Sequence, residues 1–170
     1  METRIKLFGH PIHPMLIVFP LGLLSTAVVF DVIYLITGND DLAIVSFWAI
    51  AAGIVGGLAA AIFGLIDWLA IPRDTRAKRI GLTHGIGNVV IVVLFAISWL
   101  LRLGDPGFRP SLVPFVLELL AAGIALFTAW LGGELVYRLR VAVDDDANLD
   151  ASNSLQASGV AETVSGRRGP

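Results

Sequence analysis

The sequence has no cysteine and few charged residues. Asp, Glu, Lys and Arg make up 15 % of the 170 residues, whereas soluble domains carry roughly 25 %. The absence of cysteine excludes disulfides, thiolate metal sites, iron–sulfur clusters and covalently attached c-type haem. The formal net charge of -2 gives no overall basic field, so we expect no nucleic-acid partner. With a mean hydropathy of +0.81, the chain cannot cover a soluble domain with polar side chains.

Long apolar stretches take the place of the missing charges. Four of them are long enough to cross a bilayer, which needs about 20 apolar residues: 15–37, 42–69, 80–103 and 112–136. Backbone groups in lipid must be satisfied within the segment, so these spans should be helices. Short connections force neighbouring spans to run antiparallel. The sequence therefore predicts an all-α, polytopic membrane protein, an antiparallel four-transmembrane-helix bundle over residues 1–140.

Basic residues predict the orientation of the bundle. One side holds only Arg102 and Arg109, and the other holds eight: Arg4, Lys6, Arg73, Arg76, Lys78, Arg79, Arg138 and Arg140. Because the side richer in Lys and Arg faces the cytoplasm, both termini should be cytoplasmic. Residues 141–170 are acidic and polar with few large apolar side chains, so we expect a disordered cytoplasmic tail.

Ionisable residues within the spans are few, and each is costly at mid-membrane. Asp31 and Glu118 lie toward the outer ends of spans one and four, where they could share a proton or a cation or form a structural hydrogen bond. Arg102 is the only basic residue within a span that could join them. Asp67 and Glu134 lie toward the inner ends, on the side of all three histidines, although Glu134 could instead reach Arg138. The inner end is therefore the main candidate site.

Two short segments carry the histidines. In the segment His10-Pro11-Ile12-His13-Pro14, each histidine precedes a proline and should be extended, with Pro14 starting the helix. These histidines suit metal or haem ligation, and equally an interfacial capping role. His84 and Asn88 share a helix face with two glycines, which leave room for a neighbouring helix or a porphyrin. Small-residue faces on spans two and four favour close helix packing or a homo-oligomer, and no internal repeat is convincing.

Four blocks, FGHPIHPM, FGLIDW, THGIGN and GGELVY, resemble the bacterial membrane family catalogued as "domain of unknown function 2231" over about residues 5–140. The resemblance implies a four-helix bundle in the bacterial inner (cell) membrane. Relatives joined to cytochrome c or Rieske-type domains imply electron transfer and a redox partner of that kind. The family implies no catalytic residue.

Several functions follow as hypotheses. A b-type haem would take His84 and either His13 or His10 as ligands, with Asp67 and Asn88 hydrogen-bonding around them. A Zn, Fe or Cu ion would instead take His10, His13 and His84 with Asp67 or Glu134. The alternatives are a membrane scaffold whose polar cluster is structural, and proton or ion transport through Asp31 and Glu118. A stand-alone enzyme is not favoured, because no nucleophile elbow or phosphate loop occurs.

Overall fold

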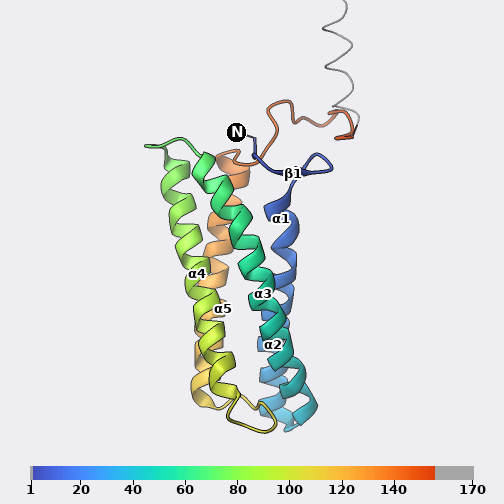
Figure 1. Ribbon diagram of the computed structural model, residues 1–170, viewed down its shortest axis with the longest axis vertical. Coiled ribbons are helices and arrows are strands. Elements are labelled where there is room, and N and C mark those ends of the chain that lie inside the picture. Colours follow the sequence, from blue (N-terminus) through green and yellow to red (C-terminus); the bar gives the residue numbers. More distant parts are fainter. Residues whose placement is uncertain (1, 156–170) are drawn as a thin grey trace, which may run out of the picture.

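The computed structural model describes residues 2–155 and is a bundle of long antiparallel helices (Figure 1). The first span consists of α1 (Ile12–Leu16) and α2 (Val18–Thr37), and the others are α3 (Asp40–Ala70), α4 (Arg76–Arg102) and α5 (Leu112–Gly133). A short π-helix, η1 (Glu134–Arg138), extends α5. Each of the four spans is long and apolar enough to cross a membrane. The predicted fold is confirmed, and the spans begin up to four residues earlier than expected.

Local capping at three helix ends explains two of the tight connections. Gly38 ends α2 in the left-handed region (φ 70°), and its N–H donates to the Tyr34 carbonyl at 2.7 Å. The Asn39 side chain accepts from the Asp41 N–H and begins α3, and the Thr75 hydroxyl accepts from the Lys78 N–H and begins α4. These short turns return the chain beside itself and produce the antiparallel order.

The N-terminal segment corrects one prediction. Strands β1 (Lys6–Leu7) and β2 (His10–Pro11) form a small antiparallel hairpin, so His10 is extended as predicted. His13 is not extended but lies in α1, which begins before Pro14. A residue before proline disfavours the helical conformation, but the hydrogen bond of His13 to α3 stabilises that conformation here. The first span breaks at Ile17, three residues before Pro20, which has no N–H to bond the preceding turn.

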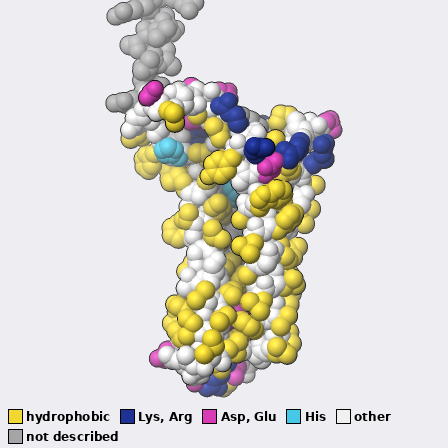
Figure 2. All heavy atoms as spheres, turned by 180° about the vertical axis from the view of Figure 1, so that it is seen from behind, with side chains coloured by type: hydrophobic (Ala, Val, Ile, Leu, Met, Phe, Trp, Pro, Cys, Tyr) yellow, Lys and Arg dark blue, Asp and Glu magenta, His cyan; other side chains and the backbone are white. Residues whose placement is uncertain are grey.

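The bundle buries small, polar and some apolar residues and exposes large apolar ones. Its central core includes Leu24, Ile50 and Phe95. Side chains such as Ile36 and Leu126 point outward and are each 78 % exposed. Apolar side chains cover the length of the molecule, and charged groups gather at its two ends (Figure 2). A large exposed apolar surface of this kind suits lipid rather than water.

Pairs of helices divide the bundle into two hairpins. In the first, α2 packs along α3, and in the second α4 packs along α5; α3 and α4 join the hairpins, whereas α2 and α5 contact each other little. Small residues on span two contact other helices within this bundle, since a Cβ on Gly53 would clash with Leu24 and one on Gly57 would press on Val92. The glycine face of span two is therefore occupied by intramolecular packing.

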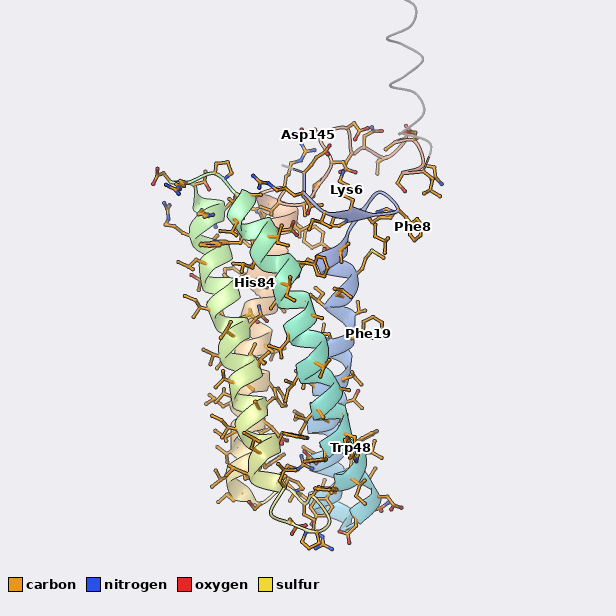
Figure 3. The ribbon with its side chains drawn as sticks, viewed as in Figure 1. Lys6, Phe8, Phe19, Trp48, His84 and Asp145 are labelled. Atoms are coloured by element: carbon orange, nitrogen blue, oxygen red, sulfur yellow. The ribbon has the colours of Figure 1, made fainter. Side chains whose placement is uncertain are left out.

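The first part of the expected disordered tail lies against the bundle end. Val141 is buried with Ile71 and Leu135. Lys6 Nζ donates to Asp144 at 2.5 Å, and this hydrogen bond raises the pKa of Lys6 above its ordinary value. Figure 3 shows Lys6 and Asp145 together at this end. The remainder of the predicted tail, residues 156–170, lies outside the described residues.

Candidate functional site

His13 is fastened to the second helix of its own hairpin. Its Nδ1 lies 2.9 Å from the Ala60 carbonyl oxygen on α3. That carbonyl also bonds within the helix to the N–H four residues on, which belongs to Gly64, and its second lone pair remains for the imidazole. A Cβ on Gly64 would lie 2.8 Å from His13 Cε1. The glycine is therefore required for the ring to reach the backbone.

His84 makes the same contact in the second hairpin. Its Nδ1 lies 2.9 Å from the Thr128 carbonyl oxygen on α5, and its ring packs on Gly132, four residues further along (Figure 3). Asn88 Nδ2 donates to the His84 carbonyl at 2.8 Å and approaches His84 Nε2 at 3.2 Å. Since Nε2 accepts from the amide, the proton of a neutral imidazole lies on Nδ1. The carbonyl bonds and the amide thus fix the orientation and tautomer of the ring.

The two histidines occupy equivalent places in the two hairpins. Each comes from the first span of its hairpin, bonds a carbonyl of the second helix, and lies against a glycine four residues after that carbonyl. Both lie at the same end of the bundle, in hairpins that are joined by the packing of α3 against α4. The sequence analysis found no convincing repeat, because this equivalence lies in the positions of a few residues rather than in continuous similarity.

The other candidates of the inner end have separate partners. His10 is exposed on β2, with Nε2 3.4 Å from Ser154 Oγ. Asp67 accepts a hydrogen bond from the buried Thr3 hydroxyl. Glu134 pairs with Arg76 at 2.6 Å, not with its i+4 neighbour. Across residues 2–155, no three His, Asp or Glu side chains are grouped closely enough to hold a metal ion.

A second polar cluster lies at the opposite end and is completely buried. The buried Arg102 guanidinium bonds both oxygens of Asp31, at 2.8 and 3.2 Å, and Glu118 Oε1 at 3.2 Å. Its remaining hydrogen bonds go to the Ser46 hydroxyl and to the carbonyls of Ala43 and Phe108. All four spans contribute, and Arg102 is bonded at all three of its nitrogens.

Glu118 is held less completely than Asp31 in this cluster. Its Oε1 accepts from Ser98 at 2.5 Å and from Arg102. Its Oε2 is buried and receives no hydrogen bond from any residue that the structure describes. Arg102 Nη1 donates to both carboxyl groups, at 2.8 Å to Asp31 and at 3.2 Å to Glu118, so the two acids lie close together. Whether Asp31 and Glu118 interact was left open by the sequence. In the structure both carboxyl groups bond the same guanidinium, that of Arg102.

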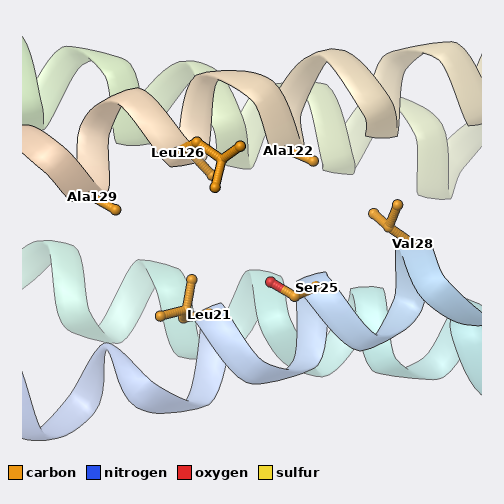
Figure 4. A pocket seen from close by; sticks show the side chains of 7 residues that line it. Leu21, Ser25, Val28, Ala122, Leu126 and Ala129 are labelled. Carbon is orange, nitrogen blue, oxygen red and sulfur yellow. The ribbon is translucent and has the colours of Figure 1, made fainter.

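A cleft separates the hairpins where α2 and α5 face each other (Figure 4). It has a volume of about 210 Å³ and is lined by small and apolar side chains, among them Leu21, Ser25, Ala122 and Ala129. Ala129 follows Thr128, whose carbonyl bonds His84. The cleft thus begins beside the histidine level and runs toward the middle of the bundle.

Sequence reasoning missed most of the partners of these side chains. Ser46 and Ser98 are ordinary residues in apolar spans, and backbone carbonyls carry no sequence signal at all. Arg102 was counted with the basic residues of the outer side, but it was also named as the one cation within a span that could join Asp31 and Glu118. It falls inside the third predicted span, and it follows His84 by the same 18 residues that separate Asp31 from His13. A charged side chain within a span is costly in contact with lipid, so Arg102 should face the interior of the bundle.

The fold and the buried polar residues define an integral membrane bundle. A family model described as "Predicted membrane protein (DUF2231)" matches residues 9–145, and the chain belongs to this family. No curated protein and no solved structure matches the chain. The expected family membership is confirmed, and it establishes a multi-pass membrane protein without assigning an activity.

Proposed function

We propose that this protein is an electron-transfer protein of the bacterial cell membrane that holds one b-type haem between His13 and His84. The observation that carries the proposal is the pair of Nδ1 contacts to the Ala60 and Thr128 carbonyls. Metal-ligating histidines almost always donate their other ring N–H to a carbonyl or carboxylate, which leaves Nε2 as the ligand atom. Facing helices of a bundle are also where such ligands are found.

The donor set fits this group. His13 Nε2 has no hydrogen-bond partner among residues 2–155, so it can accept a metal bond directly. Asn88 would release His84 Nε2 and keep its bond to the His84 carbonyl. The 210 Å³ cleft is below the roughly 300–1,000 Å³ of typical ligand sites, so α2 and α5, the least packed neighbours, would separate on binding.

The residues around the histidines would orient the ligands and keep water away from the bound group. The two backbone carbonyls keep each Nδ1 protonated and orient both rings. Apolar side chains of the cleft exclude water, and a low-dielectric setting of this kind raises the reduction potential by disfavouring the more highly charged state. A bound haem would supply a one-electron iron couple. Electrons would pass to or from partners such as cytochrome c or a Rieske protein, as the family resemblance implies.

The histidine level would lie on the cytoplasmic side, with both termini. Arg102 belongs to a buried ion network, so Arg109 alone remains as an exposed cation on the opposite side among the described residues. This strengthens the bias of basic residues toward the inner end. A reporter that works only in the cytoplasm should be active when fused after Arg140, and activity of a periplasm-specific reporter there would reverse the assignment.

A visible spectrum tests the haem directly. Protein purified in mild detergent after expression with haem supplied should show a Soret band that shifts on dithionite reduction. His13→Ala and His84→Ala should each lose or greatly alter this band. His10→Ala is the matched control, since His10 is an exposed histidine of the same end. A band that survives both ligand substitutions would refute the proposal.

The same preparation separates two other functions. A colourless protein with one bound Zn, Fe or Cu per chain would favour a mononuclear metal site, which would require His10, His13, His84 and Asp67 or Glu134 to move together from their present separate positions. A protein that binds neither haem nor metal would be better explained as a scaffold, because the same histidine contacts hold helix to helix.

A homo-oligomer would use glycines with open space beside them, such as Gly22, Gly85 and Gly123.

A further inference from the structure

We propose that the buried cluster of Asp31, Arg102 and Glu118 is a proton-binding site, in which a proton on Glu118 Oε2 is shared with the Asp31 carboxylate. The site lies at the opposite end of the bundle from the histidines. Asp31 is 18 residues beyond His13, which is about 27 Å along a helix. The inference therefore does not depend on haem binding.

Charge balance is the first argument. The cluster receives Asp31 from α2, the Ser46 hydroxyl and Ala43 carbonyl from α3, Ser98 and Arg102 from α4, Glu118 from α5 and the Phe108 carbonyl from the loop. Arg102 is the only cation in contact with the two carboxyl groups within residues 2–155. Two ionised carboxylates would leave a net negative charge with no solvent contact, and a buried uncompensated charge costs several kcal/mol. One proton neutralises the cluster.

Hydrogen bonding determines which oxygen takes the proton. Both oxygens of Asp31 accept from the two terminal nitrogens of Arg102, the arrangement of an ionised carboxylate. Glu118 Oε1 already accepts from Ser98 and Arg102, whereas Oε2 has no donor. A proton on Oε2 turns this oxygen into a donor, and the carboxyl group of Asp31, which shares Arg102 Nη1 with Glu118, is its acceptor in this proposal. The same proton thus removes the repulsion between the two acids.

The chemistry of the cluster favours a proton over a metal cation. Hard cations such as Ca²⁺ take six or more oxygen ligands. Here the Asp31 oxygens and Glu118 Oε1 are already bonded to Arg102, and only Oε2 is unsatisfied. A guanidinium at this distance would also repel a second cation. A single unsatisfied oxygen next to a carboxylate is sufficient for a proton.

Infrared spectroscopy of the full-length protein in detergent tests the proposal. At neutral pH the wild type should show the C=O stretching band of one protonated, buried carboxyl group, and Glu118→Gln should lose it. Gln keeps the shape of a protonated Glu and can donate from its amide, so we expect this variant to fold. Glu134→Gln is the matched control, because Glu134 forms a partly exposed ion pair with Arg76, and should retain the band.

Asp31→Asn provides an independent test. With Asp31 neutral, Glu118 becomes the sole counter-ion of Arg102 and should ionise, so the band should disappear although Glu118 is still present. Persistence of the band in Asp31→Asn, or its absence from the wild type, would overturn the shared proton. A wild-type melting temperature that rises with Na⁺ and does so no longer in Glu118→Gln would assign the site to a cation instead.

Discussion

Arg102→Gln should destabilise the bundle far more than any substitution of an exposed arginine. Arg102 donates six hydrogen bonds, and three of these go to carboxylate oxygens. Its side chain and those of Asp31 and Glu118 are 0 % exposed. Glutamine is shorter and uncharged, so it leaves the Asp31 carboxylate buried without a counter-ion.

The expected cost follows from this burial. Removing one partner of a buried ion pair costs about 3–5 kcal/mol, because the other charge stays desolvated. Arg109→Gln is the matched control at the same end of the bundle. Arg109 pairs with Asp40, and the two side chains are 44 % and 50 % exposed, so this change should cost below about 1 kcal/mol.

Unfolding of both variants by denaturing detergent, followed by far-UV circular dichroism, measures the difference in the free energy of unfolding. The double variant Arg102→Gln/Asp31→Asn should recover a large share of the loss, since it removes the orphaned charge together with its partner. Equal costs for Arg102→Gln and Arg109→Gln would refute the reasoning. So would a double variant as unstable as the sum of its single changes.

Two further predictions concern the inner end. Gly64→Ala should displace the His13 ring, because the new Cβ would lie 2.8 Å from it, and should lower thermal stability; Gly85→Ala has open space and should be neutral or gain up to about 1 kcal/mol. Equal melting temperatures would contradict this. Asp144→Asn should lower the raised pKa of Lys6 in an NMR titration. Any stability from this contact is present at neutral pH and disappears as pH rises through the raised pKa, so an unchanged titration would rule out the contact.

The sequence was sufficient for the spans but not for the interior of the bundle. Span length and the absence of charge follow from lipid alone, and these located the helices to within a few residues. Apolar periodicity could not orient the helices, because the inner and outer faces of a membrane helix are both apolar. Polar residues were therefore the only guide. They put Asp31 and Glu118 toward the same end of the bundle without deciding whether the two interact, and they gave no indication that Glu134 would pair with Arg76.

The sequence predicted that three histidines and two carboxyl groups would gather at the inner end, but only His13 and His84 have equivalent places there. The reason is similar. Side chains near a helix end have many possible partners, since loops and termini also lie there. Thr3 and Arg76, which bond Asp67 and Glu134, come from such segments, and their positions cannot be derived from helix geometry. The contacts of His13 and His84 are made instead within the hairpins, where antiparallel packing limits the choice of partner.

The equivalence of the two hairpins connects the two polar sites. In the first span His13 lies in α1 and Asp31, 18 residues later, lies in α2; in the third span His84 and Arg102 are also 18 residues apart, both in α4. Eighteen residues make five turns of an α-helix, so Arg102 lies on the same face of α4 as His84. The backbone hydrogen bonds that continue across Ile17 keep Asp31 near the same register relative to His13. Two similar hairpins that meet face to face therefore bring both pairs to the interior, the imidazoles at one end and the opposite charges at the other. Like charges at positions 31 and 102 would repel each other there. The Asp31–Arg102 ion pair therefore favours this arrangement of the two hairpins over other arrangements in which the apolar packing would be equally good.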